Sequence, residues 1–351
     1  MSEKTKNEEL DFTNLGFKYR RMPYRFRAYN KDGKWSEGSL ETNERILIHE
    51  GATVLHYGQA AFEGLRAFLR ADGTVGIFRP YENATRFRRS CERLLIPPVS
   101  TEMFIDALYQ VTKANVDYLP PYGTGASFYL RPYIYGDGEN LGVSAAPEYV
   151  FSVFVAPIAS YYGSDASDGK LAAGKYLIST DYDRAAPHGT GADKIGGNYA
   201  ASLLPGHLAK SSGYVDVIYL DSATHTKIEE LGGANFYGIT ADNEFVTPAS
   251  ESILPSITKK SVMELAKDAG MKVTEREVFA DQLGDFTETG AMGTGAVIAP
   301  IGQIDYAGRT FTYGDGIHAG EKTEYLYNTL RKIQFGELQD EKGWILDVKV
   351  N

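Results

Sequence analysis

The sequence predicts an α+β protein of two domains, on three observations. The chain has 351 residues, more than most single domains contain. Both halves mix short β-rich runs with apolar residues at helical spacing. Between them, residues 158–190 are rich in Gly, Ser, Asp and Ala with weak periodicity, which is typical of a connection. We expect a smaller α/β N-terminal domain over 1–157 and a larger mixed α/β C-terminal domain over 191–351.

The first half is predicted to be a sheet with helices packed on one side. Residues 17–50 alternate β-rich runs with turns, which is typical of antiparallel strands. A run over 75–79 leads into Pro80, and the following apolar residues recur at helical spacing over 81–95. Because proline suits the first turn of a helix, we expect a helix to begin there. A second helix over 101–117 and strands over 126–135 and 147–156 complete this half.

The second half has a similar mixture of elements. Helices are predicted over 199–212 and 256–269. The expected strands cover 215–221, a paired region over 227–247, 271–278 and the apolar run 291–302.

Composition excludes several classes of protein. The formal net charge of −10 disfavours a general attraction to nucleic acid or to anionic lipid. The lone cysteine, Cys91, excludes an intrachain disulfide and a cysteine-rich metal site, which suits a reducing cytosol. The polar start MSEKTKNEEL lacks the apolar core of a signal peptide, and the longest uncharged runs are too short to span a membrane. We therefore expect a cytoplasmic protein without a metal site.

The stretch GADKIGGNYA, residues 191–200, surrounds Lys194 with glycines and places Tyr199 five residues later. It is compatible with a surface loop, a phosphate-binding loop or the attachment point of a covalent cofactor. A Walker loop requires G-x-x-x-x-G-K-[S/T], whereas Ile195 follows the lysine here, so spacing excludes that interpretation. A lysine that forms a Schiff base with pyridoxal 5′-phosphate needs small neighbours, a partner for the ring nitrogen and a phosphate site.

Seven segments in order supply those partners, and through them the chain resembles the branched-chain aminotransferases of the fold-type IV pyridoxal-phosphate enzymes. The resemblance extends from about Phe12 to Phe335. The segments are LHYGQAAFEGLRAF (55–68), IFRPYENATRF (77–87), YLRPYIYG (129–136), DKIGGNYAASL (193–203), IEELGGANFYGIT (228–240), LPSITKKSV (254–262) and MGTGAVIAPI (292–301). Any one of them alone would be a weak signal, whereas seven in order are specific.

The resemblance implies that Lys194 is the catalytic lysine, which binds the cofactor as a Schiff base and then moves a proton at the substrate α-carbon. It implies that Glu230, and not its neighbour Glu229, pairs with the pyridinium nitrogen; strand alternation places the two on opposite faces. Tyr199 would donate a hydrogen bond to the phenolic oxygen of the cofactor. The implied phosphate partners are Arg79, Ile257, Thr258 and Thr294.

For the substrate, the resemblance implies an aromatic pocket that admits both a branched apolar side chain and a carboxylate. Tyr129 and Arg131 are two apart on a predicted strand and so share a face, with Arg131 as partner for the γ-carboxylate. Backbone N–H groups of Gly295 and Ala296 would hold the α-carboxylate. The remaining implied wall residues are Tyr57, Phe62 and Tyr161.

The implied reaction is reversible transamination between leucine, isoleucine or valine and 2-oxoglutarate, and the implied assembly is a homodimer. The nearest alternatives, D-amino-acid aminotransferase and aminodeoxychorismate lyase, share the fold, so they would keep Lys194 and Glu230 and differ around the substrate. A non-catalytic binder of a phosphate ligand on the same fold is a third alternative, and the intact lysine disfavours it. One departure from many relatives is Gly295, in Thr-Gly-Ala where they have Thr-Ala-Ala or Thr-Ala-Cys.

Overall fold

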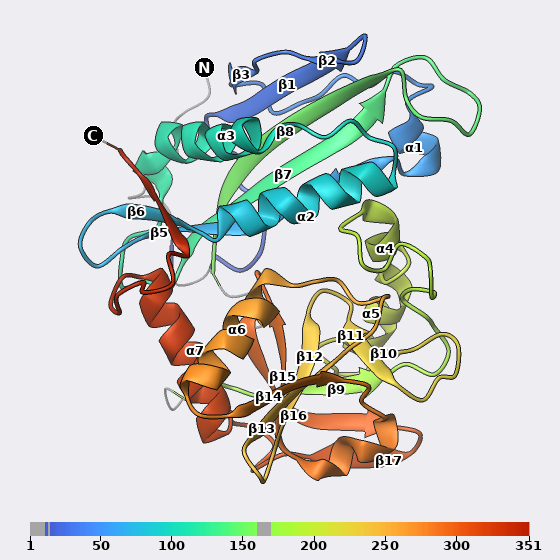
Figure 1. Ribbon diagram of the computed structural model, residues 1–351, viewed down its shortest axis with the longest axis vertical. Helices are drawn as coiled ribbons and strands as arrows, with labels where there is room; N and C mark the ends of the chain where they lie inside the picture. Colours follow the sequence, from blue (N-terminus) through green and yellow to red (C-terminus); the bar gives the residue numbers. More distant parts are fainter. Residues whose placement is uncertain (1–10, 13–14, 160–169, 351) are drawn as a thin grey trace. The chain divides into compact units, whose positions relative to one another are not determined.

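The computed structural model describes residues 11–12, 15–159 and 170–350, and in it the chain forms two nine-stranded sheets (Figure 1). Each sheet belongs to its own compact unit. The first unit comprises Met1–Ala159, Asp193–Gly196 and Lys332–Asn351, and the second comprises Ser160–Ala192 and Gly197–Arg331. The first unit thus includes two segments, 193–196 and 332–351, that the sequence alone groups with the second half.

The sheet of the first unit is antiparallel throughout, with strand order β18-β6-β5-β7-β8-β1-β2. β3 also pairs with β1, and β4 with β7. The strands are β1 (Arg25–Lys31), β2 (Lys34–Trp35), β3 (Ser39–Glu41), β4 (Ala60–Phe62), β5 (Leu65–Leu69), β6 (Val75–Phe78), β7 (Ser127–Asp137), β8 (Glu148–Ile158) and β18 (Ile345–Val348). The helices are α1 (Thr53–Tyr57), α2 (Pro80–Arg93), α3 (Thr101–Ala114) and the 3₁₀ turn η2 (Val116–Tyr118).

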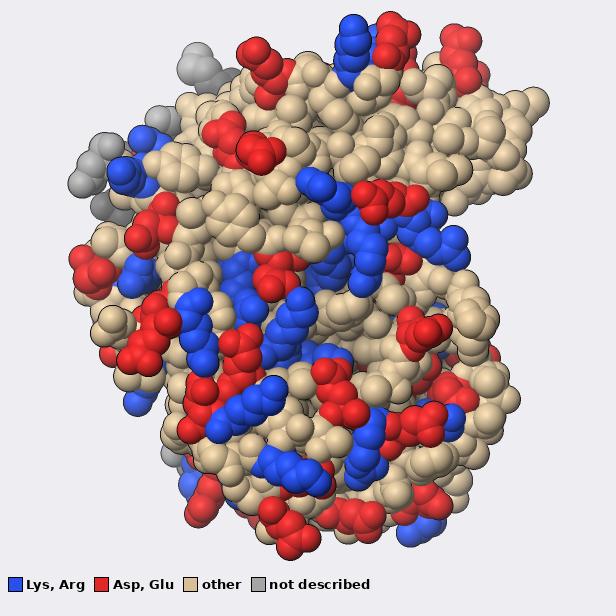
Figure 2. All heavy atoms as spheres, viewed as in Figure 1, with Lys and Arg blue, Asp and Glu red and all other residues tan. Residues whose placement is uncertain are grey.

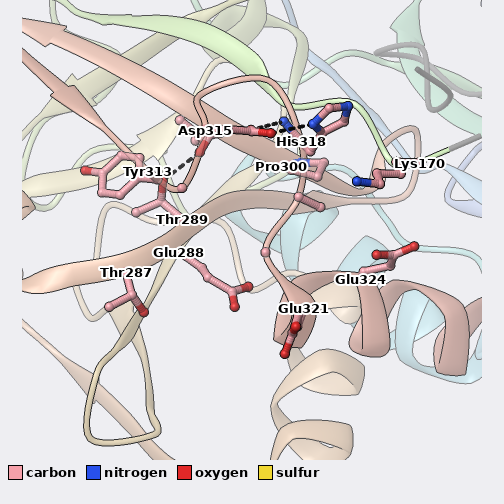
Figure 3. Close-up of a pocket in the computed structure, with 14 residues that line it drawn as sticks. Lys170, Thr287, Glu288, Thr289, Pro300, Tyr313, Asp315, His318, Glu321 and Glu324 are labelled. Atoms are coloured by element: carbon pink, nitrogen blue, oxygen red, sulfur yellow. Dashed lines mark hydrogen bonds and ion pairs between the residues drawn. The ribbon is translucent and has the colours of Figure 1, made fainter. Parts of the chain in front are cut away.

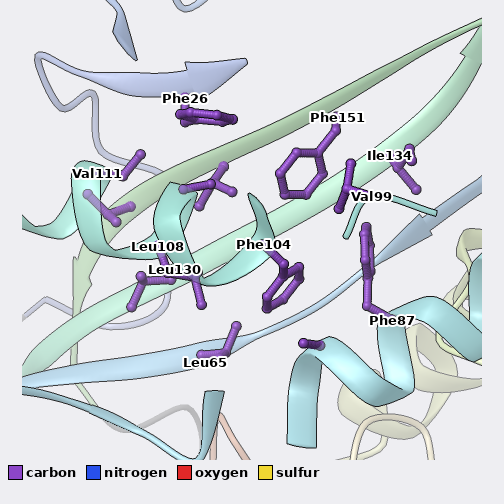
Figure 4. Close-up of a cluster of buried hydrophobic side chains, with 14 of the residues drawn as sticks. Phe26, Leu65, Phe87, Val99, Phe104, Leu108, Val111, Leu130, Ile134 and Phe151 are labelled. Atoms are coloured by element: carbon purple, nitrogen blue, oxygen red, sulfur yellow. The ribbon is translucent and has the colours of Figure 1, made fainter. Parts of the chain in front are cut away.

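Helices α2 and α3 pack together on one face of this sheet, as predicted (Figures 1 and 4). The contact is centred on Phe87 of α2, Phe104 of α3 and Phe151 of β8, whose ring centroids are 5.3 to 6.2 Å apart. All three rings are almost completely buried, and burial of one such ring contributes about 1.5–3 kcal/mol to the free energy of unfolding. This packing fixes α2, which begins directly after Arg79 and carries Ser90 near its end.

The sheet of the second unit is mixed, and the pairing of β11 with both β10 and β12 closes part of it into a ring. Its strands are β9 (Gly174–Ile178), β10 (Val217–Leu220), β11 (Ile228–Leu231), β12 (Asn235–Thr240), β13 (Glu244–Pro248), β14 (Lys272–Arg276), β15 (Phe286–Gly293), β16 (Val297–Tyr306) and β17 (Arg309–Thr312). The remaining helices are α4 (Gly196–Ala200), α5 (Leu203–Ser211), α6 (Ile257–Asp268), η3 (Ala280–Asp285) and α7 (Glu321–Gln334). On the face drawn in Figure 2, acidic and basic side chains are interspersed over this unit.

Most predicted elements are confirmed, with two differences in the second half. The single helix predicted over 199–212 is two helices, α4 and α5. Pro205, which has no N–H to donate to a preceding turn, lies in the first turn of α5, where proline is tolerated. The apolar run 291–302 is a hairpin of β15 and β16 that turns at residues 294–296.

Candidate functional site

The main chain of Lys194 is hydrogen-bonded to two other segments of the first unit. Its N–H donates to the Ser90 hydroxyl oxygen at 2.8 Å, and its carbonyl accepts from the Phe62 N–H at 3.0 Å. The next residue, Ile195, forms a β-bridge with Ala61. These contacts fix the direction of the lysine side chain, whose Nζ lies 4.8 Å from the centroid of the Phe62 ring.

The glycines around Lys194 have different structural roles. A Cβ at Gly196 or Gly197 would have no heavy atom within 4 Å, so these two residues leave open space. A Cβ at Gly191 would collide with the Ser252 carbonyl oxygen and would lie 3.0 Å from Nη2 of Arg184. Gly191 therefore permits close backbone packing within the second unit.

Arg131 and Tyr129 share a face of β7, as the sequence predicts, and meet Phe62 there. The Arg131 guanidinium lies 5.0 Å from the centroid of Phe62 and 5.1 Å from that of Tyr129, and its Nη2 donates to the Tyr129 hydroxyl at 3.3 Å. Phe62 thus contacts two cationic groups, Arg131 and Lys194. In the described part of the chain, the buried Nε of Arg131 has no hydrogen-bond acceptor, so a donor remains for an anionic ligand.

Gly64 allows the Tyr129 ring to occupy its position. A Cβ at residue 64 would collide with the Tyr129 hydroxyl oxygen and lie 2.6 Å from the adjoining ring carbon. Phe17 packs edge-on against the same ring, with centroids 4.9 Å apart. The phenol is therefore held from two directions beside Arg131.

The sequence predicts two other wall residues, Tyr57 and Tyr161. Tyr57 ends α1, is about half exposed, and donates a 2.5 Å hydrogen bond to the carbonyl oxygen of Leu141. Tyr161 lies outside the described residues. Their substrate contacts stay predictions.

Arg79 precedes Pro80 as the N-cap of α2 and has a left-handed backbone, with φ 46° and ψ 44°. Its N–H donates to the carbonyl oxygen of Trp344 at 2.6 Å, and its guanidinium lies 4.8 Å from the indole of the same residue. Trp344 is far away in the sequence, and no pattern in the sequence links the two residues.

Glu230 is almost completely buried on β11 and accepts hydrogen bonds at both carboxylate oxygens. Nη2 of Arg184 lies 2.5 Å from Oε1, the Leu254 N–H donates to Oε1 at 3.0 Å, and the Asn235 side chain donates to Oε2 at 2.7 Å. The same Nη2 donates to the carbonyls of Gly191 and Ser252. Arg184 is a charged partner that the sequence prediction missed.

Glu229, the neighbour of Glu230, has different partners. Its Oε1 accepts from the Ser250 hydroxyl at 2.7 Å, and its Oε2 is buried without a hydrogen bond in the described structure. Burial raises the pKa of the Glu229 carboxyl. The separate partners of the two carboxylates agree with the alternation expected along a strand.

The other predicted cofactor residues lie at the ends of elements in the second unit. Ile257 and Thr258 open α6, whose N-cap, Ser256, accepts a hydrogen bond from the Lys259 N–H at 3.1 Å. The first N–H groups of such a helix have no partner within the helix and favour an anion. Tyr199 lies on the short helix α4.

Thr294, Gly295 and Ala296 form the turn between β15 and β16. The residue after them, Val297, has φ of 60°, which is unusual for a β-branched side chain. The turn is therefore followed by a strained residue.

One pocket within the second unit, with a volume of about 400 Å³, does not contain these residues (Figure 3). Two of its acidic side chains, Glu288 and Asp315, have structural partners. Glu288 accepts from the N–H groups of Lys322 and Thr323 at the start of α7, and Asp315 pairs with His318 at 2.6 Å. Among the described residues, no cluster of His, Cys, Asp and Glu suits a metal ion, and no helix is long and apolar enough to cross a membrane.

Comparison with known proteins defines the class to which the chain belongs. Residues 60–304 match the family model for amino-transferase class IV, and the chain belongs to this family of enzymes. Such enzymes depend on pyridoxal phosphate.

Within that family, the chain belongs to the branched-chain-amino-acid aminotransferases. It is 52% identical to the Haemophilus influenzae branched-chain-amino-acid aminotransferase, over 97% of this chain and 100% of the relative. The enzyme of the same name from Helicobacter pylori is 51% identical over 97% of this chain and 98% of the relative.

A solved structure agrees with this membership. The branched-chain amino acid aminotransferase from Escherichia coli superposes with a TM-score of 0.76 and 28% identity, covering 93% of this chain and 99% of that chain. The predicted α+β fold of the fold-type IV enzymes is confirmed.

Proposed function

We propose that the protein catalyses reversible transamination between a branched-chain L-amino acid and 2-oxoglutarate, which gives the branched-chain 2-oxo acid and L-glutamate. The cofactor would be pyridoxal 5′-phosphate, attached to Nζ of Lys194 as a Schiff base. The observation that carries this proposal is the arrangement of Lys194, Phe62 and Arg131 in the first unit. It combines a fixed lysine, an apolar ring and a guanidinium, as a site for both apolar and acidic side chains requires.

The donor set fits the cofactor. The buried, hydrogen-bonded carboxylate of Glu230 suits a protonated ring nitrogen, and the Tyr199 hydroxyl suits the phenolic oxygen. Arg79, the first turn of α6 at Ile257 and Thr258, and Thr294 suit the phosphate. The cofactor, when bound, supplies an electron sink for the substrate α-carbon.

The residues of the chain would then orient the substrate and move protons. The Lys194 amine would carry the proton between the substrate α-carbon and the cofactor carbon that accepts the amino group. Arg131 would pair with the γ-carboxylate of glutamate, and the rings of Phe62 and Tyr129 would line the space for a branched side chain. Backbone N–H groups of Gly295 and Ala296 would hold the α-carboxylate, and Tyr57 and Tyr161 would complete the wall.

Absorption spectroscopy tests the role of Lys194. The purified protein with pyridoxal 5′-phosphate should show the visible band of a lysine-bound cofactor, and Lys194→Ala should lose it together with activity. Lys210→Ala, at an exposed position on α5, is the matched control and should keep both. A band that survives in Lys194→Ala would contradict the assignment.

The alternatives on the same fold differ in substrate. A panel of L- and D-amino acids, each followed through one turnover by the change in cofactor absorbance, distinguishes them. We expect conversion with L-leucine, L-isoleucine and L-valine. Conversion with D-amino acids alone would favour a D-amino-acid aminotransferase, and release of pyruvate from aminodeoxychorismate would favour the lyase. A protein that converts none of them would be a non-catalytic binder.

A homodimer is supported by exposed apolar side chains on neighbouring loops of the first unit. Leu47, Leu141 and Val143 are 87 to 96% exposed. Their loops are adjacent, because the His49 N–H donates to the Asp137 carboxylate at 3.0 Å. Clusters of exposed apolar side chains mark interaction surfaces. Light scattering should give about twice the 38.6 kDa of one chain, and Leu141→Asp with Val143→Asp should lower that mass.

A cytoplasmic location is proposed on the cysteine content. The lone Cys91 is a free, buried thiol, as is usual in a reducing compartment. Fractionation of cells that express the full chain tests this location.

A further inference from the structure

The backbone of Arg79 is strained, and contacts from a distant part of the chain hold it. Left-handed φ and ψ are unfavourable for a residue other than glycine, so the surrounding structure must hold such a residue in place. On the chain's own side, Pro80 fixes the start of α2 directly after Arg79. On the other side, the Arg79 N–H is held by the Trp344 carbonyl at 2.6 Å.

The C-terminal strand brings Trp344 to this position. β18 pairs with β6 in antiparallel register, so that Ile345 lies opposite Phe78, and Trp344 therefore lies beside Arg79. The indole is almost completely buried and packs edge-on against the Phe78 ring, with centroids 5.6 Å apart. The indole therefore has a fixed orientation when it meets the guanidinium at 4.8 Å.

Stacking on the indole determines which part of the guanidinium is available for an anion. An aromatic ring attracts the flat face of a guanidinium, whereas oxygen acceptors bind its N–H groups in the plane. Contact with the indole therefore restrains the Arg79 guanidinium without using the N–H groups that bind a phosphate. Charged groups described nearby include Glu82, whose Oε1 lies 3.5 Å from Arg79 Nη2, and Lys342, whose Nζ lies 5.9 Å from the indole centroid.

We propose that Trp344 is a positioning residue for phosphate binding. Its indole holds the Arg79 guanidinium so that the N–H groups can bind the 5′-phosphate of the cofactor. This inference rests on the proposed function, because it assumes that Arg79 binds that phosphate. It assigns the C-terminal strand β18 a role in cofactor affinity in addition to its role in the sheet.

The test compares two forms of the cofactor that differ only in the phosphate. Cofactor-free full-length protein is titrated with pyridoxal 5′-phosphate and, separately, with pyridoxal, and binding is followed by absorbance. Trp344→Leu should weaken binding of pyridoxal 5′-phosphate about tenfold and leave pyridoxal binding unchanged. Trp344→Phe, which keeps an aromatic face, should recover most of the loss. Lys342→Ala is the control, since it removes the other cation near the indole.

A double-mutant cycle ties the effect to Arg79. Arg79→Ala should weaken the binding of pyridoxal 5′-phosphate more than Trp344→Leu does. Adding Trp344→Leu to Arg79→Ala should reduce that affinity little further. Equal losses for both ligands, or additive losses in the cycle, would show a general packing role and overturn the positioning role. If Arg79→Ala has no effect, the phosphate assignment itself is wrong and this role of Trp344 with it. An effect of Arg79→Ala with none of Trp344→Leu would refute the role of Trp344 alone.

Discussion

The main-chain N–H of Lys194 donates a 2.8 Å hydrogen bond to the hydroxyl of Ser90, which is fully buried in the last turn of α2. The Ser90 hydroxyl in turn donates to the Arg86 carbonyl in the preceding turn of α2. The same helix begins directly after Arg79. One helix therefore fixes both the lysine and the arginine that the proposed cofactor requires.

We expect Ser90→Ala to weaken both stability and cofactor binding. It leaves the Lys194 N–H without its acceptor, which costs about 1–3 kcal/mol for a buried group. Urea denaturation and titration with pyridoxal 5′-phosphate measure the two effects. Ser152→Ala is the matched control, because Ser152 is a buried serine that bonds only to the Phe26 carbonyl in the bonds described for its side chain. It should lose stability but keep cofactor affinity; equal loss of affinity in both variants would contradict a specific role of Ser90.

We expect Arg131→Ala to lower kcat/KM for 2-oxoglutarate more than kcat/KM for 4-methyl-2-oxopentanoate. Removal of the guanidinium leaves the γ-carboxylate without a partner, whereas an apolar side chain loses only contact area. The ratio of the two kcat/KM values should change at least about tenfold. Tyr129→Phe is the control, since it removes only the hydroxyl that accepts from Arg131. An unchanged ratio in Arg131→Ala would argue against the γ-carboxylate role.

We expect Gly64→Ala to raise KM for both substrates and to lower the melting temperature only slightly. The added methyl group would collide with the Tyr129 hydroxyl, so the ring must move away from Arg131. Steady-state kinetics and a thermal melt separate the two effects. Gly206→Ala, on α5 with no heavy atom within 4 Å of the new Cβ, should leave KM unchanged. A normal KM in Gly64→Ala would show that the position of the Tyr129 ring is not critical.

The sequence predicts what local pattern and close spacing can specify. Pro80 marks the start of α2, and two-residue spacing puts Tyr129 and Arg131 on one face of β7, where the structure places them. Strand alternation separates Glu229 from Glu230 in the same way. These features depend on φ preferences and on the periods of helix and strand, which a few neighbouring residues determine.

The supporting residues that no sequence pattern reveals act through contacts between distant parts of the chain. Ser90, Arg184 and Trp344 each support a predicted site residue, and each is an ordinary serine, arginine or tryptophan in its local context. Trp344 reaches Arg79 only because β18 pairs with β6, and no sequence pattern predicts α7 or β18 at the end of the chain. Gly191 is one of the small neighbours expected to make room for a cofactor, but a Cβ there would collide with the backbone of Ser252. Local sequence patterns do not specify which distant residues will contact one another.

The buried carboxyl of Glu229 is a further consequence of the EE pair on β11. Glu230 has a charged partner in Arg184 at 2.5 Å, whereas Glu229 has one hydrogen bond and one buried oxygen without a partner in the described structure. Burial raises the pKa of Glu229 above its ordinary value of 4.5, although Ser250 and Arg184 partly oppose this shift. The folded protein therefore holds this proton at pH values where the unfolded chain has released it.

Stability should accordingly fall as pH rises from about 4.5 through the folded pKa of Glu229, since folding then requires burial of an ionised carboxylate. We expect Glu229→Gln to raise the free energy of unfolding of the cofactor-free protein at pH 7, with the gain shrinking toward about pH 4. Urea denaturation across this pH range measures it. Glu230→Gln should instead cost about 3–5 kcal/mol at pH 7, because it leaves the buried Arg184 uncompensated. A Glu229→Gln variant less stable than wild type at pH 7 would mean that its carboxylate is ionised and stabilising.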